Sequence, residues 1–330
     1  MAVEGEPRAG RAGRRWLRPA ALLAGLVLTA LLLADNDWRR IGFILAGAGP
    51  GIVLVVALHL PQTLASAWAW GMLIEGGGPS LGLLYGMRWV RDSINTLLPV
   101  AQVGGDVVRV RLLTRTTGAS GGRAAAATVV DIALETIAQV VFTLGAVAVL
   151  LIGSHGTDVR RLAWAVLAGS TVIAAALIAA QRSRLLRWVE RLAGGERRWR
   201  WLGDLAGLQA AVLALHRQPR RLWASTAAHL AAWGFGAVET YAGLRVIGVG
   251  AGFAQAVVIE ALGHAARALG FLIPGALGIQ EGGYVLVCAL YGIGAPHALA
   301  LSAIKRVREL ALGLPGLAWW GWVERERDAT

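Results

Sequence analysis

Two related segments, one in each half of the chain, constrain its fold more than any other feature. The first reads LPVAQVGGD at 98–106 and the second reads IPGALGIQE at 273–281. In each, a proline is followed seven residues later by a carboxylate, Asp106 or Glu281. Both stand in apolar sequence, where a broken helix and an ionisable group are costly unless they face a cavity. Matching interrupted segments in two halves of a chain are typical of a transporter-like membrane protein.

The composition excludes an ordinary soluble domain. The 330 residues are 56% hydrophobic and have a mean hydropathy of +0.58. Apolar runs long enough to cross the ~30 Å hydrocarbon core of a bilayer occur at 19–34, 51–74, 124–152, 162–180 and 222–244. We therefore predict an all-α, polytopic integral membrane protein. Its parts would be a basic N-terminus (1–18), a single membrane domain (19–322) and a C-terminal tail (323–330).

Arginine-rich loops orient the predicted spans. Arginines cluster in 8–18, 109–123 and 181–221, and positively charged loops remain on the cytoplasmic side. This topology accounts for the net charge of +12 without a nucleic-acid partner. Counting the crossings between these loops places both termini in the cytoplasm, and a bacterial inner membrane is the expected location. The first proline segment then enters from the inside and the second from the outside.

Because the two related segments enter the membrane from opposite sides, we predict an inverted-topology repeat with two proline-broken helical hairpins. The first repeat would cover about 50–181 and the second about 222–322, joined by the Arg-rich cytoplasmic linker 181–221. The sequence leaves open whether each hairpin is re-entrant or a pair of short spans. The residues expected to shape or gate the hairpins are Pro99, Gly104, Gly105, Asp106, Pro274, Gly278 and Glu281.

The segment that precedes the first proline is too polar for a lipid-facing helix. Arg88, Arg91 or Asp92, and Asn95 share one helical face. A guanidinium there could bind the oxyanion of a headgroup, or the Arg and Asp side chains could simply neutralise one another. Asp106 could also have a structural role instead of a functional one, as a helix cap or as an ion-pair partner of Arg109. The expected substrate-binding set is Arg88, Arg91, Asp92, Asn95, Gln102, Arg109, His264 and Arg267.

Further carboxylates lie within the apolar spans. Asp131 and Glu135 are four residues apart and would line the bundle interior. They could carry a coupling proton, or they could pair with arginines of the first hairpin. The possible proton-coupling residues are Asp131, Glu135, Glu239 and Glu260. The histidines show no metal-ligand spacing and Cys288 is the single cysteine, so neither a metal nor a cofactor is expected.

No known catalytic motif is present. The sequence contains no P-loop, no HExxH and no nucleophile elbow. A transporter is therefore expected rather than an enzyme, with movement that is passive or ion-coupled. Two alternatives stay open, a membrane-embedded enzyme that modifies lipids and a scaffold for lipid-biosynthesis enzymes.

The two hairpin segments resemble a known family. RDSINTLLPVAQVGGDVVR at 91–109 and PGALGIQEGG at 274–283 are similar to the signatures of the lysylphosphatidylglycerol synthase membrane region, also called flippase-like, and the resemblance covers roughly 20–322. It implies movement of a membrane lipid. The motif PVAQVGGD is most similar to that of hopanoid-associated members of this family, which implies a hopanoid cargo. A phospholipid is the wider alternative. The soluble aminoacyl-transferring domain of the full synthases is not in this sequence, so lipid lysylation is not expected.

Overall fold

The computed structural model describes five continuous stretches of the chain. They are 36–76, 78–98, 103–153, 207–269 and 273–328, with single positions inside 23–34 and 161–179. These residues form ten α-helices and one 3₁₀ helix, which confirms the all-α prediction. Outside the described residues lie most of the predicted spans 19–34 and 162–180, linker residues 181–206, Pro99 and Gln102.

The first half contributes five of these helices. They are α2 (Trp38–Ala48), α3 (Gly51–Gly71), α4 (Leu81–Leu97), α5 (Gly104–Thr117) and α6 (Gly121–Gly153). Polar caps fix two of the starts, because the Asp37 carboxylate accepts a hydrogen bond from the backbone N–H of Arg39 (3.0 Å) and the Ser80 hydroxyl accepts one from that of Leu83 (3.4 Å). Helix α5 ends at Gly118, whose left-handed backbone (φ 69°) suits glycine.

The second half follows a similar order. It contains α9 (Leu208–His216), α10 (Pro219–Val246), α11 (Phe253–Leu269), the 3₁₀ helix η2 (Pro274–Ala276), α12 (Ile279–Ala289) and α13 (Ala295–Asp328). Both predicted breaks coincide with helix ends, between α4 and α5 and between α11 and α12. Helix α9 was not expected, since it lies in the stretch predicted to be a linker. Its apolar sequence, LQAAVLALH, packs against α6.

The helices of the two hairpins are short. Helices α4 and α11 have 17 residues each, α5 has 14 and α12 has 11. At 1.5 Å per residue, α12 extends about 16 Å, roughly half of the hydrocarbon thickness. The second arm of each hairpin is therefore too short to cross a bilayer as one straight helix.

Two described helices are long and apolar enough to cross a membrane. They are α3 and residues 121–152 of α6. Helices α10 and α13 are also long, with 28 and 34 residues, but they carry several buried ionisable side chains. Those side chains face the polar interior described below.

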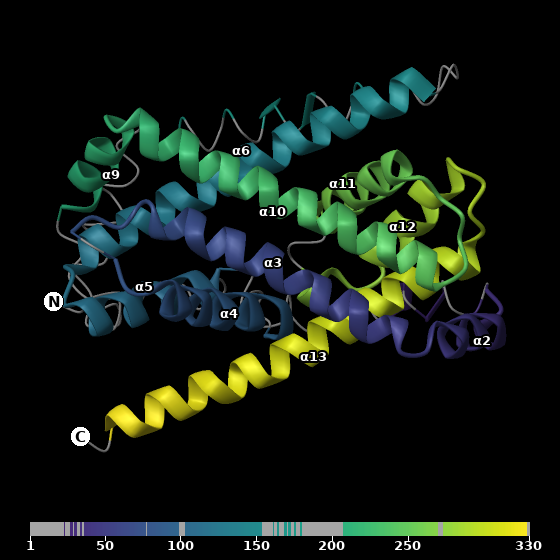
Figure 1. The fold of residues 1–330 in the computed structure, drawn as a ribbon, viewed down its shortest axis with the longest axis horizontal. Coiled ribbons are helices and arrows are strands. Elements are labelled where there is room, and N and C mark those ends of the chain that lie inside the picture. The colour runs from purple at the N-terminus through teal and green to yellow at the C-terminus, as the bar shows by residue number, and fades with distance from the viewer. Residues whose placement is uncertain are drawn as a thin grey trace, which may run out of the picture.

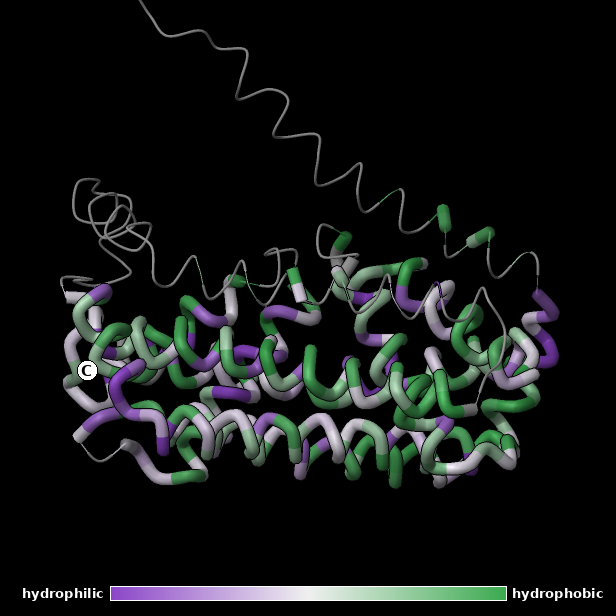
Figure 2. The backbone as a smooth tube through the Cα atoms, turned by 90° about the horizontal axis from the view of Figure 1, so that it is seen from above, coloured by the Kyte–Doolittle hydropathy of each residue, from purple (hydrophilic) through white to green (hydrophobic). Residues whose placement is uncertain are grey.

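The long helices run along an elongated molecule, with α3 and α10 packed against each other at its centre (Figure 1). Each hairpin also contacts the last helix of the other half, because α4 packs on α13 and α11 packs on α6. The short helices that precede α3 and α10 make corresponding contacts with the other half, since α2 packs on α13 and α9 packs on α6. Polar and apolar positions alternate along most of the helices (Figure 2).

In the part of the chain that the structure describes, two apolar cores flank a polar centre. One gathers around Trp70, Met87 and Leu113, and the other around Tyr284 and Leu301. Helices α3 and α6 run through both cores. On each of these two helices, the residues that line the central cavity lie between the parts that enter the two cores.

Candidate functional site

A cavity of about 380 Å³ lies between the two halves of the chain. Its wall is formed by α3, α4 and α6 from the first half and by α10, α11 and α13 from the second. Charged side chains reach it from both hairpins, including Arg91 of α4 and Arg267 of α11. Among the described residues, three groups of ionic side chains surround this cavity.

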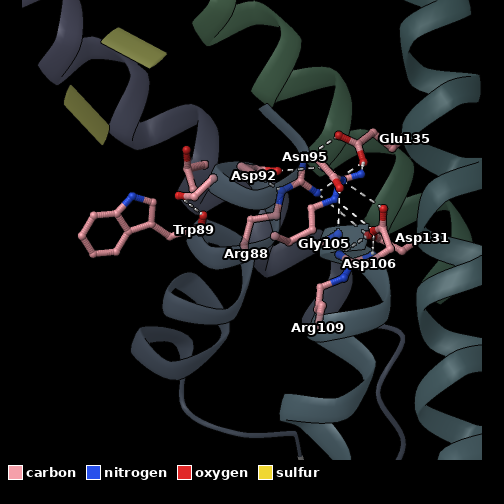
Figure 3. Close-up of polar contacts among 12 residues, drawn as sticks. Arg88, Trp89, Asp92, Asn95, Gly105, Asp106, Arg109, Asp131 and Glu135 are labelled. Carbon is pink, nitrogen blue, oxygen red and sulfur yellow. Dashed lines mark hydrogen bonds and ion pairs between the residues drawn. The ribbon is translucent and has the colours of Figure 1, made fainter. Parts of the chain in front are cut away.

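The first-hairpin cluster joins α4, α5, α6 and α10 (Figure 3). It consists of Arg88, Arg91, Asp92, Asn95, Asp106, Arg109, Asp131, Glu135 and His229. The four carboxylates accept hydrogen bonds from arginines on two helices. Such pairing is what permits charge in an apolar environment.

Asp106 holds the two arms of the first hairpin together. As the third residue of α5, its carboxylate accepts hydrogen bonds from Arg91 Nε (3.0 Å), Arg109 Nη2 (3.0 Å) and Asn95 Nδ2 (3.2 Å). The Asn95 side chain also accepts a hydrogen bond from the backbone N–H of Gly105 (2.8 Å). Gly105 is required at this contact because a Cβ atom would collide with the backbone carbonyl of Arg91.

Glu135 and Asp92 bind the two cavity-lining arginines of α4. Arg88 donates to both Glu135 oxygens (2.5 and 3.3 Å) and Arg91 donates to one (3.3 Å). Asp92 accepts from Arg88 Nε (3.0 Å) and from Arg91 Nη1 (2.8 Å). Of the two alternatives for Glu135, these contacts correspond to pairing with arginines of the first hairpin.

Asp131 lies behind the cavity wall and is fully buried. It accepts a hydrogen bond from Arg109 Nη1 (2.8 Å) and lies 2.9 Å from His229 Nε2 of α10. The Arg109 guanidinium in turn stacks over the Trp70 ring of α3, 4.5 Å from its centroid. This single arginine therefore connects α5 with α3 and α6.

The central cluster joins α3, α10, α11 and α13. Its members are His59, Glu239, Thr240, Glu260, His264, Lys305 and Arg308. Glu239 contacts Arg308 Nη1 (2.5 Å), Lys305 Nζ (3.3 Å) and His59 Nδ1 (2.9 Å). Lys305 also donates to Glu260 (2.8 Å), so one buried ammonium joins two carboxylates.

The second-hairpin cluster joins α11, α12 and α13. It consists of Arg267, Gln280, Glu281, Ser302, Arg306 and Glu309. Glu281, the third residue of α12, accepts a hydrogen bond from the backbone N–H of Gly278 (2.7 Å) and one from Arg306 Nε (2.9 Å). Arg306 also donates to the carbonyl of Gly275 (2.7 Å), in the break itself, and to Glu309 (2.9 Å).

The structure divides the expected site residues between the cavity wall and the shell behind it. The wall contains Arg88, Arg91, Asp92, Asn95, Glu135, His264 and Arg267. The shell contains Asp106, Arg109, Asp131, Glu239, Glu260 and Glu281, all of them buried. Gly104, Gly105, Pro274 and Gly278 lie at the breaks, whereas Pro99 and Gln102 lie outside the described residues.

Sequence reasoning missed two histidines of the cavity wall, whereas the basic residues of α13 were recognisable from the sequence. His59 and His229 line the cavity, but a single histidine in an apolar helix carries no distinguishing signal. Lys305, Arg306 and Arg308 are more conspicuous, because three basic residues within an apolar helix must have partners.

The charges of the three clusters nearly cancel. Among the described residues, the seven cations are Arg88, Arg91, Arg109, Arg267, Lys305, Arg306 and Arg308, and each lies within 4.0 Å of a carboxylate. The eight carboxylates are Asp92, Asp106, Asp131, Glu135, Glu239, Glu260, Glu281 and Glu309. With neutral histidines the net charge is therefore −1. The arrangement can hold a polar group without presenting it with a free charge.

Removing Arg109 tests whether the buried pairs stabilise the fold. Arg109→Met leaves Asp106 and Asp131 without a shared partner, and we expect a loss of about 3–5 kcal/mol in the free energy of unfolding. Arg123→Met is the matched control, since Arg123 is exposed, and it should change stability by about 0.5 kcal/mol or less. Unfolding of the purified proteins in detergent measures both. Equal stability of the two variants would contradict the structural role of Arg109.

Comparison with protein families assigns most of the chain to one family. Residues 19–316 match the family described as lysylphosphatidylglycerol synthase TM region, in agreement with the resemblance of the two hairpin segments. A comparison with curated proteins finds no match. The chain is therefore an integral membrane protein of the lysylphosphatidylglycerol synthase TM region family.

Proposed function

We propose that this protein moves a polar-headed lipid across the bacterial inner membrane by admitting the headgroup to its central cavity. The family is associated with membrane lipid handling. The observation that carries the proposal is the cavity itself, because helices of both halves line it with charged and polar side chains. Polar walls inside a membrane protein mark a path for a polar substrate.

Alternating access through an inverted repeat is the proposed mechanism. The order of α3 to α6 corresponds to that of α10 to α13, and the packing of α4 on α13 corresponds to that of α11 on α6. Both hairpins also place a carboxylate at the third residue of their second helix, Asp106 in α5 and Glu281 in α12. These correspondences support two repeats, over about 50–181 and 222–322, that rock about the central pair α3 and α10.

The lipid tail would stay outside while the headgroup crosses. Helix α3 separates the two environments, since His59, Gln62 and Ser66 face the cavity while Leu60 and Trp68 are exposed on the outer surface. Only the headgroup then needs the polar interior. If movement is coupled to protons, the contacts of Asp131, Glu239 and Glu260 with histidines are where protons would enter.

The proposed cargo is a hopanoid or another polar-headed lipid. This assignment rests on the similarity of the first hairpin to hopanoid-associated members of the family. The proposed orientation has both termini in the cytoplasm, and enzymes of lipid biosynthesis are proposed partners. A lipid-modifying enzyme is the competing function, and a lipid inventory distinguishes the two.

Site-directed labelling tests the proposed topology. Ser120 lies between α5 and α6, and Gly294 lies between α12 and α13. With the buried Cys288 replaced by Ala, we expect an impermeant maleimide to label Gly294→Cys in intact cells. Ser120→Cys should react only after permeabilisation. Labelling of both from the same side would contradict the inverted repeat.

Filling the cavity tests the transport proposal directly. Ala268 of α11 lines the cavity and is exposed to it, whereas Ala254 of the same helix is exposed elsewhere. In proteoliposomes, Ala268→Trp should slow the transbilayer movement of a fluorescent lipid about tenfold, because the indole occupies the space of the headgroup. Ala254→Trp should move lipid at the unmodified rate. Unchanged movement by Ala268→Trp would exclude the cavity as the path.

A further inference from the structure

The cationic side chains of the cavity wall are already occupied. Arg88, Arg91, Arg267 and Arg308 line the cavity, and each is bound to a carboxylate. An anionic headgroup would have to displace one of these carboxylates. Leaving a buried carboxylate without its partner is strongly destabilising. The wall therefore disfavours a net negative charge.

Several uncharged polar side chains of the wall, by contrast, are free to bind. They include Gln62 and Ser66 of α3, Tyr85 of α4 and Gln139 of α6. Gln62 and Ser66 are four residues apart and share a face. Within the described part of the chain, the side chains of these four residues make no hydrogen bond with the protein, and the buried Gln62 Oε1 is an acceptor without a donor.

A buried carboxylate oxygen lies close to Gln62. Glu260 is 1% exposed, and its Oε1 atom lies 3.2 Å from His264 Nε2. Both oxygens approach Gly236 of α10, where a Cβ atom would lie 2.9 Å from Glu260 Oε1 and 3.4 Å from Gln62 Oε1. Gln62 Oε1 is therefore the acceptor that an O–H donor would satisfy, because a buried acceptor without a partner is costly.

Aromatic rings are also part of the cavity wall. Tyr85, Trp89 and Trp233 line it, and Trp233 is fixed edge-on against the His264 ring, 4.9 Å between centroids. Aromatic faces cover C–H groups, while amides and hydroxyls bind O–H groups. A molecule whose surface alternates between C–H and O–H groups satisfies both.

We infer that the cavity selects a lipid whose headgroup is an uncharged polyol, a sugar or polyalcohol, held by hydrogen bonds from Gln62, Ser66, Tyr85 and Gln139. This inference rests on the proposed function and names the class of headgroup. The ionic clusters then act as a rigid, charge-compensated frame. The selecting contacts come from the uncharged side chains between them.

Transport of three defined lipids tests the inference. Proteoliposomes would carry acyl-labelled monoglucosyl diacylglycerol, phosphatidylglycerol or phosphatidylcholine, and dithionite quenching would report their transbilayer movement. We expect the glucosyl lipid to move at least about tenfold faster than either phospholipid. Equal or faster movement of phosphatidylglycerol overturns the exclusion of anions. Equal movement of phosphatidylcholine overturns the role of the hydroxyl groups.

Variants of the uncharged wall provide the second test. Gln62→Leu combined with Gln139→Leu should slow the glucosyl lipid about fivefold or more, the effect of losing hydrogen bonds to a buried group. Gln218→Leu and Ser225→Ala are controls, because neither residue lines the cavity, and both should move the lipid at the unmodified rate. An unchanged rate for the double variant overturns the assignment of these residues.

Binding separates this inference from the proposed function. If no lipid moves, the transport proposal fails, and native mass spectrometry of the purified protein with an equimolar mixture of the three lipids decides the inference alone. Preferential retention of the glucosyl lipid supports it, and its loss in the double variant assigns the contact. Equal retention of all three lipids overturns it.

Discussion

The structure depends on buried ion pairs that join helices from different parts of the chain. In a bilayer, apolar contact between helices has little advantage over contact with lipid, so polar contacts and close packing determine which helices associate. Arg109 illustrates this, because it links α5 to α6 through Asp131 and to α3 through the Trp70 ring. Glu239 has the same effect among α3, α10 and α13.

The hairpins are stabilised by the same means at their breaks. Asp106 and Glu281 each occupy the first turn of a short helix, where a carboxylate is favoured by the helix dipole. Arginine then binds each carboxylate, Arg91 from the preceding arm in the first hairpin and Arg306 from α13 in the second. The broken helices thus become ordered supports of the cavity wall. The charge-compensated wall accounts for how a polar cavity can exist without a free buried charge.

The sequence predicted part of this arrangement and could not predict the rest. The breaks near Pro99 and Pro274 and the polar face of 88–95 follow from local rules, because proline and charge are conspicuous in apolar sequence. Which groups pair is decided by the crossing of distant helices. The contact of Arg306 with Glu281 is an example, since it requires α13 to pass the second break. His59 and His229 gave no local signal, and α9 was obscured by the arginines around it.

A lipid inventory of a strain that lacks this protein tests the central claim most directly, with inner and outer membranes analysed separately. If the protein moves a lipid, that lipid is made in its normal total amount but is retained in one membrane, and it is identified by its accumulation there. Complete absence of one lipid would contradict the account. The carboxylates around the cavity would then have to be reconsidered as parts of an enzyme active site.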